Sequence, residues 1–173
     1  MAITSVARPP TLSWTNFVSV ANLVDPTDGT PQDSVTKFRF DIPDRRPRQI
    51  GNEFAMAETF EIGVTPDAKI RTGAGQTDAL LAHEQLHYDV GICIMRRVAH
   101  ELTRLRANSL AELRTAFLGV VHLHVERRAA LIQRRYDIDS NHSLNHHYQH
   151  VWSRMIKHAL NHPPATHIGG FWL

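Results

Sequence analysis

Cysteine is almost absent from this sequence, and so are long apolar runs. The single cysteine, Cys93, excludes an intramolecular disulfide and a cysteine-rich zinc site, so a bound metal must take nitrogen and oxygen ligands. No segment approaches the roughly 20 consecutive apolar residues that a membrane-spanning helix requires. Residues 1–10 also lack the hydrophobic stretch of a signal peptide. We therefore expect no membrane association, and a cytoplasmic location by default.

A strong excess of one charge is missing as well. Lysine and arginine number 19 and aspartate and glutamate 17, which gives a formal net charge of +2. The basic residues are spread along the chain, whereas a nucleic-acid-binding protein usually has a dense basic surface. Histidine, in contrast, occurs 12 times, and seven of these residues lie within the C-terminal segment 142–167: His142, His146, His147, His150, His158, His162 and His167. This bias favours a metal-binding protein.

Hydrophobic patterning divides the chain into two parts. With 173 residues and 42% hydrophobic content, the sequence can form the core of a single domain over residues 1–173. In residues 1–75 apolar and polar side chains alternate, notably over 38–42 and 60–64, which predicts strands. In residues 76–162 the apolar spacing becomes three to four residues, which predicts helices. The expected fold is α+β, with a short antiparallel N-terminal sheet packed on about three α-helices.

Three helices are predicted in the second part. The first should cover residues 77–106, and the second should begin after the capping box Ser109-Leu110-Ala111-Glu112. Residues 136–143 are polar and predict a turn. The third helix should follow with Asn145 as its N-cap, Tyr148 among its inward-facing residues, and an end before Pro163.

The sharpest chemical motif is His83-Glu84-Gln85-Leu86-His87. On a helix, side chains four residues apart lie one above the other, so His83 and His87 can bind one metal ion. Both fall in an apolar stripe with Leu80 and Val90, and two buried imidazoles need a polar partner. Glu84 lies about 100° around the helix, where it can contact a water on the metal without being a ligand. The motif therefore indicates a zinc hydrolase with Glu84 as general base.

A catalytic zinc needs a third protein ligand, and the helix of the motif does not supply one. Glu101 lies about 21 Å beyond His87 along an unbroken helix. The residues after His87 also lack the glycine and third histidine of the metzincin motif. The ligand must come from a later element, and the candidates are His142, Glu126, His122, His124, His146 and His147.

Three blocks of the sequence are similar to a known family. Two of them, Leu80-Leu81-Ala82-His83-Glu84-Gln85-Leu86-His87-Tyr88-Asp89 and Tyr136-Asp137-Ile138-Asp139-Ser140-Asn141-His142, resemble the bacterial zinc-dependent proteases catalogued as domain of unknown function number 922. The N-terminal Leu12-Ser13-Trp14-Thr15-Asn16-Phe17 resembles the opening motif of that family. The resemblance implies a zincin-like fold, a Zn²⁺ cofactor and peptidase activity.

The resemblance also makes His142 the third metal ligand. In the family this histidine is usually followed by glycine, and the present chain has Ser143 instead. Serine can close a polar turn, although it lacks the freedom of glycine at positive φ. Family members are often exported.

The sequence thus predicts a zinc metallopeptidase. The family resemblance implies that a peptide or protein substrate binds as an added strand near residues 60–64. Asp89, Tyr136 and Asp137 are candidates for groups that orient the ligands or stabilise an oxyanion. The alternative hypothesis is a non-catalytic interaction domain that zinc only stabilises. The two differ in coordination, because a structural zinc has four protein ligands whereas a catalytic zinc has three and an open position. We expect neither nucleic acid nor a membrane as a partner.

Overall fold

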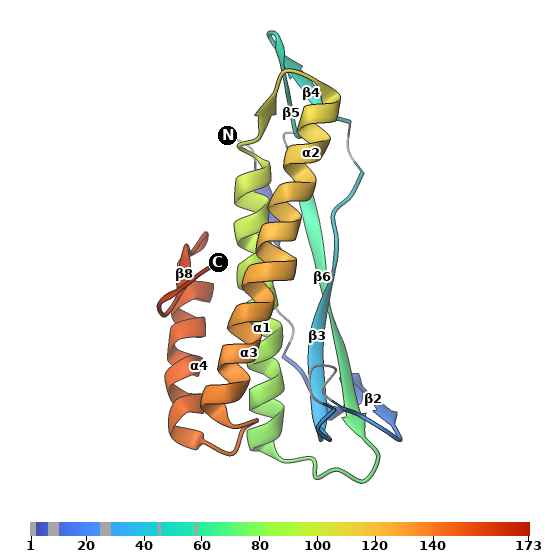
Figure 1. Ribbon diagram of the computed structural model, residues 1–173, viewed down its shortest axis with the longest axis vertical. Coiled ribbons are helices and arrows are strands. Elements are labelled where there is room, and N and C mark those ends of the chain that lie inside the picture. Colours follow the sequence, from blue (N-terminus) through green and yellow to red (C-terminus); the bar gives the residue numbers. More distant parts are fainter. Residues whose placement is uncertain (1–2, 7–10, 25–28, 45, 58) are drawn as a thin grey trace.

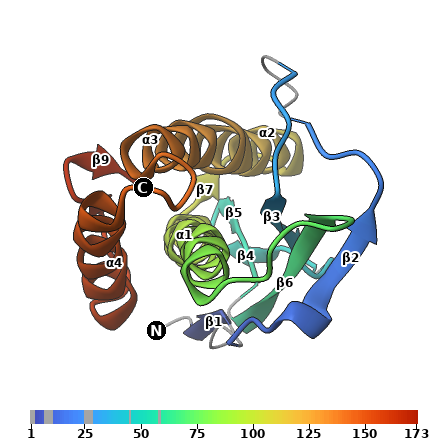
Figure 2. The same cartoon turned by 90° about the horizontal axis from the view of Figure 1, so that it is seen from below.

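A computed structural model describes residues 3–6, 11–24, 29–44, 46–57 and 59–173 of the chain (Figure 1). Strands fill most of the N-terminal part and helices most of the remainder, so the expected α+β class is confirmed. The long helix α1 (Asp78–Leu102) lies between the main sheet on one side and the other helices on the opposite side (Figure 2). This central position explains why α1 can carry a buried site.

The main sheet is organised around one long strand, β6 (Thr59–Arg71). On one side of β6 lies β3 (Ser34–Asp41), which is antiparallel to it as the sequence predicts. On the other side, β1 (Ile3–Val6) and β2 (Phe17–Val20) pair with its beginning and its end, and both are parallel to it. The sheet is therefore mixed. The parallel pairs were not expected, because alternation in a sequence predicts strands but neither their partners nor their directions.

One face of this sheet packs on α1. Ile62, Val64, Ala68 and Ile70 of β6 alternate with exposed or half-buried residues and belong to the buried set. The approach of α1 to β3 is close at Gly91, where a Cβ atom would lie 2.4 Å from the Phe38 ring. Glycine at this position lets the helix lie directly against the strand.

Helix α1 begins where the sequence predicts. Its N-cap is Thr77, whose hydroxyl accepts a hydrogen bond from the Leu80 N–H at 3.2 Å. All residues from Leu86 to Met95 are buried, as expected for a helix covered on all sides. After Leu102 the chain forms the short strand β7 (Arg106–Ala107), which pairs with β5 (Glu53–Ala55) and, through it, extends a small sheet to β4 (Arg48–Ile50).

A second helical rod runs from residue 110 to residue 140. It consists of α2 (Leu110–Val121), a π-helical segment over His122–Ala129 and α3 (Ala130–Ser140). The Ser109 hydroxyl caps it by accepting from the Glu112 N–H, and the Glu112 carboxylate accepts from the Asn108 N–H. The polar turn expected over 136–143 is wrong in its first half, because α3 continues through Ser140 and the turn covers 141–144. Tyr136 and Ser140 are fully buried, so the polarity of this segment belongs to an interior helix face.

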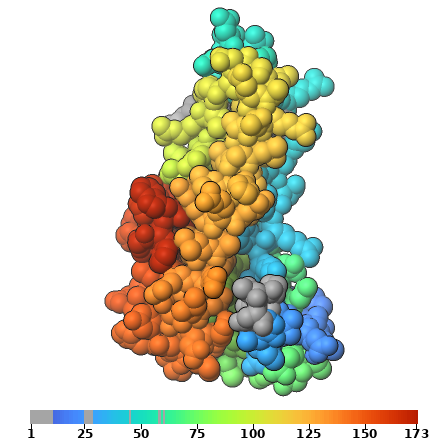
Figure 3. Space-filling view, viewed as in Figure 1, coloured from blue at the N-terminus to red at the C-terminus, as the bar shows by residue number. Residues whose placement is uncertain are grey.

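The third rod is α4 (His146–Asn161), which begins at the predicted N-cap Asn145. Trp152 and Ile156 are buried, but Tyr148 is 46% exposed and does not face inward as expected. The chain ends in a hairpin of β8 (His167–Ile168) and β9 (Phe171–Trp172) that lies against the side of the helical layer (Figure 3). Among the described helices, none has both the length and the apolar character needed to cross a membrane.

Candidate metal centre

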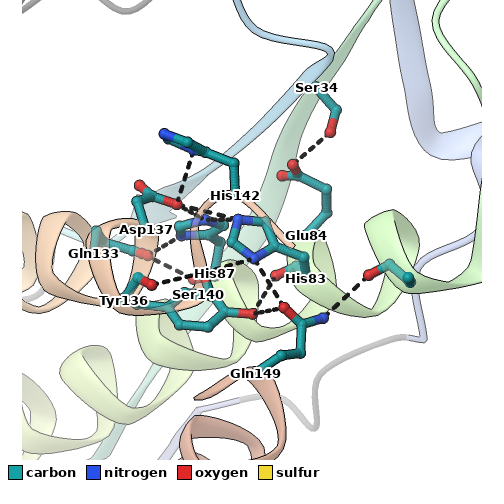
Figure 4. Close-up of polar contacts among 11 residues, drawn as sticks. Ser34, His83, Glu84, His87, Gln133, Tyr136, Asp137, Ser140, His142 and Gln149 are labelled. Carbon is teal, nitrogen blue, oxygen red and sulfur yellow. Dashed lines mark hydrogen bonds and ion pairs between the residues drawn. The ribbon is translucent and has the colours of Figure 1, made fainter. Parts of the chain in front are cut away.

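The two histidines of the motif lie on the buried face of α1, in its second and third turns. His83 is 2% exposed and His87 is 7% exposed. Their rings meet edge to face with centroids 4.6 Å apart, and their Nε2 atoms are 2.9 Å apart (Figure 4). The helical spacing therefore brings the two donor atoms to one point, as the sequence predicts.

Asp137 of α3 completes a group of three potential ligands. Its Oδ1 atom lies 3.1 Å from His83 Nε2 and 2.8 Å from His87 Nε2. Among the described residues, these three are the group of histidine, cysteine, aspartate or glutamate side chains whose ligand atoms all lie within 4.8 Å of one another. The sequence predicts only a supporting role for Asp137, whereas in the structure its Oδ1 atom contacts the Nε2 atoms of both imidazoles.

Two glutamine side chains contact the Nδ1 atoms of the imidazoles, on the side of each ring away from Asp137. Gln149 Oε1 lies 3.2 Å from His83 Nδ1, and Gln133 Oε1 forms a short contact with His87 Nδ1. The amide nitrogens of both glutamines donate to backbone carbonyls, Gln149 to Ala79 at 3.1 Å and Gln133 to His87 at 2.9 Å. A carbonyl oxygen only accepts, so each amide oxygen must face its imidazole. Both histidines therefore carry a hydrogen on Nδ1 and turn Nε2 toward Asp137.

This arrangement fits a metal cation. Without a cation, two Nε2 lone pairs and a carboxylate oxygen would face one another at contact distance, which is strongly repulsive. Histidine ligands that donate Nδ1–H to a fixed oxygen are the common pattern at zinc sites. The separations of 2.8, 2.9 and 3.1 Å are a few tenths of an ångström shorter than the roughly 3.3 Å between the ligands of a tetrahedral zinc. A small opening of the site would accommodate the ion.

The electrostatics of the ligands point the same way. Burial lowers the pKa of His83, and the neighbouring His87 lowers it further. Burial also disfavours the charged form of His87, but Asp137 and Glu84 outweigh this effect and raise its pKa to about 9. Burial would raise the pKa of Asp137, yet the two histidines hold it well below its usual range. A metal-free centre thus retains one proton between His87 and Asp137, in the place that a metal would take.

Tyr136 supports the centre from the side opposite Asp137. Its ring stacks on His83 with centroids 4.6 Å apart, and its hydroxyl donates to Gln149 Oε1 at 3.1 Å. Burial raises the pKa of Tyr136, so that the hydroxyl keeps its proton. Because this side chain is 0% exposed and its proton is directed at Gln149, it fits the role of orienting a ligand and does not fit that of an oxyanion donor.

Glu84 faces the sheet. Its carboxylate is buried, and Oε1 accepts a hydrogen bond of 2.5 Å from the hydroxyl of Ser34, at the start of β3 (Figure 4). Within the described part of the chain, Oε2 has no hydrogen-bond partner. A buried carboxylate oxygen without a partner is costly, and such atoms are common where a substrate or water binds.

His142, the third ligand implied by the family resemblance, lies at the rim. Its side chain is 54% exposed, and Nδ1 is 3.7 Å from Asp137 Oδ1, so it contacts the centre only through Asp137. The backbone here is left-handed at Asn141, His142 and Ser143, with φ of 46°, 48° and 78°. Ser143 therefore occupies a conformation that favours glycine, the residue that the family usually has there.

The remaining candidates lie elsewhere. Glu126 is exposed and pairs with His122 at 2.7 Å, while His124 is buried 3.1 Å from Glu101. His146 and His147 are exposed on the first turn of α4. These residues are outside the group of converging ligand atoms.

Asp89 also has a different role from the expected one. Its carboxylate accepts a hydrogen bond from Gln85 Nε2 at 2.8 Å, and Gln85 Oε1 accepts from the Leu12 N–H at 2.6 Å. These bonds fasten the segment before β2 to α1. Burial raises the pKa of Asp89, as expected for a structural carboxylate away from the cations of the centre.

Comparisons with protein-family models, with curated proteins and with solved structures found no match for this chain. The likeness to the family with number 922 therefore stays a prediction. The sequence did not predict the contacts of Ser34, Gln133 and Gln149 or the central place of Asp137. One signal was available: Gln133, Tyr136, Asp137 and Ser140 follow helical spacing and share a face of α3.

Proposed function

We propose that this protein is a zinc-dependent hydrolase of the metallopeptidase class, with the metal held by His83, His87 and Asp137. The observation that carries the proposal is the convergence of His83 Nε2, His87 Nε2 and Asp137 Oδ1, backed by glutamines that fix both imidazoles as Nδ1–H tautomers. Two imidazoles and one carboxylate without a thiolate form a donor set typical of catalytic zinc sites.

Zinc held by His83, His87 and Asp137 would lower the pKa of a coordinated water and polarise a substrate carbonyl. The residue that moves the proton in this proposal is Glu84. Ser34 holds Oε1, which leaves Oε2 as the atom that accepts a proton from the attacking water. The same carboxyl group can then deliver the proton to the leaving nitrogen of a peptide.

We expect the substrate to bind along β3, and not near residues 60–64 as the sequence analysis expected. The strand β6 is central to the sheet: it pairs with β1 up to Ile62 and with β3 from Gly63 onward. In the described part of the chain, β3 pairs only with β6, so its outer edge is available for an added strand. Because β3 begins at Ser34, a peptide along this edge would pass Glu84.

The second candidate function is a non-catalytic domain stabilised by zinc, and it depends on the position of His142. If His142 moved inward, four protein ligands would close the site, as in structural zinc centres. In its present place the side chain is more than half exposed and lies beyond Asp137. This geometry favours the three-ligand, catalytic arrangement.

The test compares wild type with Glu84→Gln. Glutamine keeps the size of the side chain but cannot take a proton at neutral pH. We expect about one zinc per chain in both proteins, and cleavage of denatured protein or a mixed peptide library that falls by about 10² to 10⁴ in the variant. A wild type that holds zinc but cleaves no peptide, ester or amide would favour the structural-zinc function. Undiminished cleavage by Glu84→Gln would place the base elsewhere.

A further inference from the structure

A second histidine cluster lies between α4 and the C-terminal hairpin. His158 lies in the last turn of α4, His162 is its C-cap residue, and His167 opens β8. All three line one surface pocket of about 700 Å³, together with Arg154 and Met155. None of the pocket's lining residues contributes to the centre formed by His83, His87 and Asp137. The pocket is therefore independent of the proposed active site.

The imidazoles of His158 and His162 lie side by side at the end of α4. Their ring centroids are 4.2 Å apart, and both side chains are exposed. His162 Nδ1 lies 2.8 Å from the carbonyl oxygen of His158, which can only accept, so Nδ1 carries the hydrogen. In the neutral ring the lone pair is then on Nε2. An unprotonated nitrogen cannot donate to an anion, but it is a good ligand for a transition metal.

We propose that His158 and His162 form a second transition-metal site, which His167 completes from the hairpin. The chemical class is a borderline divalent ion such as Zn²⁺, Ni²⁺ or Cu²⁺, because imidazole suits these ions. Among the described residues, no carboxylate lines the pocket to attract Ca²⁺ or Mg²⁺. Binding should be weaker than at the first centre. Among the described residues, only His83, His87 and Asp137 already bring three ligand atoms within 4.8 Å, and Arg154 adds a repelling charge.

A metal in this pocket would fasten the hairpin to α4. The hairpin already packs through Ile168 and Leu173, both fully buried, but its outer residues are exposed. Trp172 is one of these, and its ring lies over His167 with centroids 3.9 Å apart. A paramagnetic ion bound by His167 would therefore quench the fluorescence of Trp172, which supplies a local reporter.

The experiment titrates Ni²⁺ into a His83→Ala/His87→Ala background, which removes the first centre. We expect saturable quenching of tryptophan fluorescence with about one equivalent, and a higher melting temperature with the metal. Both effects should disappear in His158→Gln/His162→Gln and persist in His147→Gln, a matched exposed histidine of α4 without a histidine four residues away. In Trp172→Phe, calorimetry should still record binding while the quenching is lost.

Two results would overturn the proposal: unchanged Ni²⁺ binding in His158→Gln/His162→Gln, or quenching by inorganic phosphate that depends on Arg154, which would make the pocket an anion site. If the background variant does not fold, the same titration is made on wild type already loaded with one equivalent of zinc. Because the first centre is absent or filled in either case, failure here leaves the proposed hydrolase function untouched, and the reverse also holds.

Discussion

The hydroxyl of Ser34 donates a 2.5 Å hydrogen bond to Glu84 Oε1 across 50 residues of sequence. This bond joins the edge strand β3 to the motif helix, and both side chains are buried. It fixes the rotation of the carboxylate, and the other oxygen, Oε2, has no hydrogen-bond partner among the residues that the structure describes. The strand β3, along which we expect the substrate, thereby orients the carboxylate of Glu84, the proposed proton acceptor.

The first prediction concerns this pair. Hydrogen bonds to charged groups typically contribute about 1.5 to 3 kcal/mol, and removal of the donor leaves a buried carboxylate with no partner. Ser34→Ala should therefore lower the free energy of unfolding by an amount in that range, and Ser34→Thr should restore most of it. The measurement is a double-mutant cycle in urea denaturation with Glu84→Ala, which removes the acceptor. Additive effects of the two substitutions would mean that the bond contributes nothing.

The second prediction concerns the glutamines behind the imidazoles. Loss of an outer-shell partner typically weakens metal binding by about 10- to 100-fold. We expect this loss of zinc affinity in Gln133→Leu and Gln149→Leu, measured by competition with a chelating dye. The matched controls, Gln133→Glu and Gln149→Glu, keep an oxygen facing Nδ1 and should bind zinc more tightly than the leucine variants. Equal affinity of the leucine variants and wild type would contradict the assigned tautomers.

Much of the helical part could be predicted, because its signals are local. Ser109 and Asn145 cap the helices as their side chains suggest, and the HExxH spacing alone brings two imidazoles together. Asp137 was predicted to lie in a turn because residues 136–143 are polar, and a polar stretch usually indicates a turn. Here the polar face of α3 points inward to the centre, so polarity marks the site and not the surface.

Non-local features could not be predicted in the same way. Ser34 reaches Glu84 only because β3 lies beside α1, and no pattern within either segment encodes that pairing. The parallel direction of β1 and β2 was missed for the same reason. Alternation specifies a strand and its buried face, whereas strand order depends on the whole fold.

The third prediction concerns the turn after α3. Ser143 has φ of 78°, a conformation that costs an L-residue roughly 1 to 2 kcal/mol relative to glycine. Glycine also loses more entropy on folding, so the net gain from Ser143→Gly should be about 0.5 to 1 kcal/mol. Chemical denaturation of Ser143→Gly and of the control Ser143→Ala, which keeps the strain, measures the difference. If the glycine variant is no more stable than the alanine variant, strain at this position is negligible.

The fourth prediction concerns the number of protons that zinc binding releases. In the metal-free protein the raised pKa of His87, about 9, means that this imidazole is protonated at pH 7.5. Zinc requires the unprotonated nitrogen, so binding should release about one proton per zinc at pH 7.5 and progressively less as the pH rises beyond 9. Calorimetric titrations in two buffers with different ionisation enthalpies give this number. Asp137→Asn should reduce it, because the carboxylate is the main group that raises the pKa of His87.

The same shift predicts the pH dependence of metal-free stability. The pKa of His87 is higher in the folded chain than the roughly 6.5 of an unfolded histidine, so the folded state binds the proton more tightly. Its contribution is fully present below pH 6.5 and is lost as the pH rises through about 9. Unfolding of the chelator-treated protein should become easier across this range, and His87→Gln should flatten the profile. A profile that is equally steep in His87→Gln would assign the effect to another group.

The last prediction decides which residue completes the centre. Asp137 Oδ1 touches both imidazoles, whereas His142 is exposed and 3.7 Å from that carboxylate. Asp137→Asn should therefore weaken zinc binding by more than the 100-fold typical of an outer-shell change, and His142→Ala by less than tenfold. Both variants should remain folded by circular dichroism, since the core of α1 and α3 is unchanged. Strong loss of zinc in His142→Ala together with retention in Asp137→Asn would make His142 the ligand, as the family resemblance implies. Strong loss in both variants would mean four protein ligands and a closed site, in which case the structural-zinc function would replace the hydrolase.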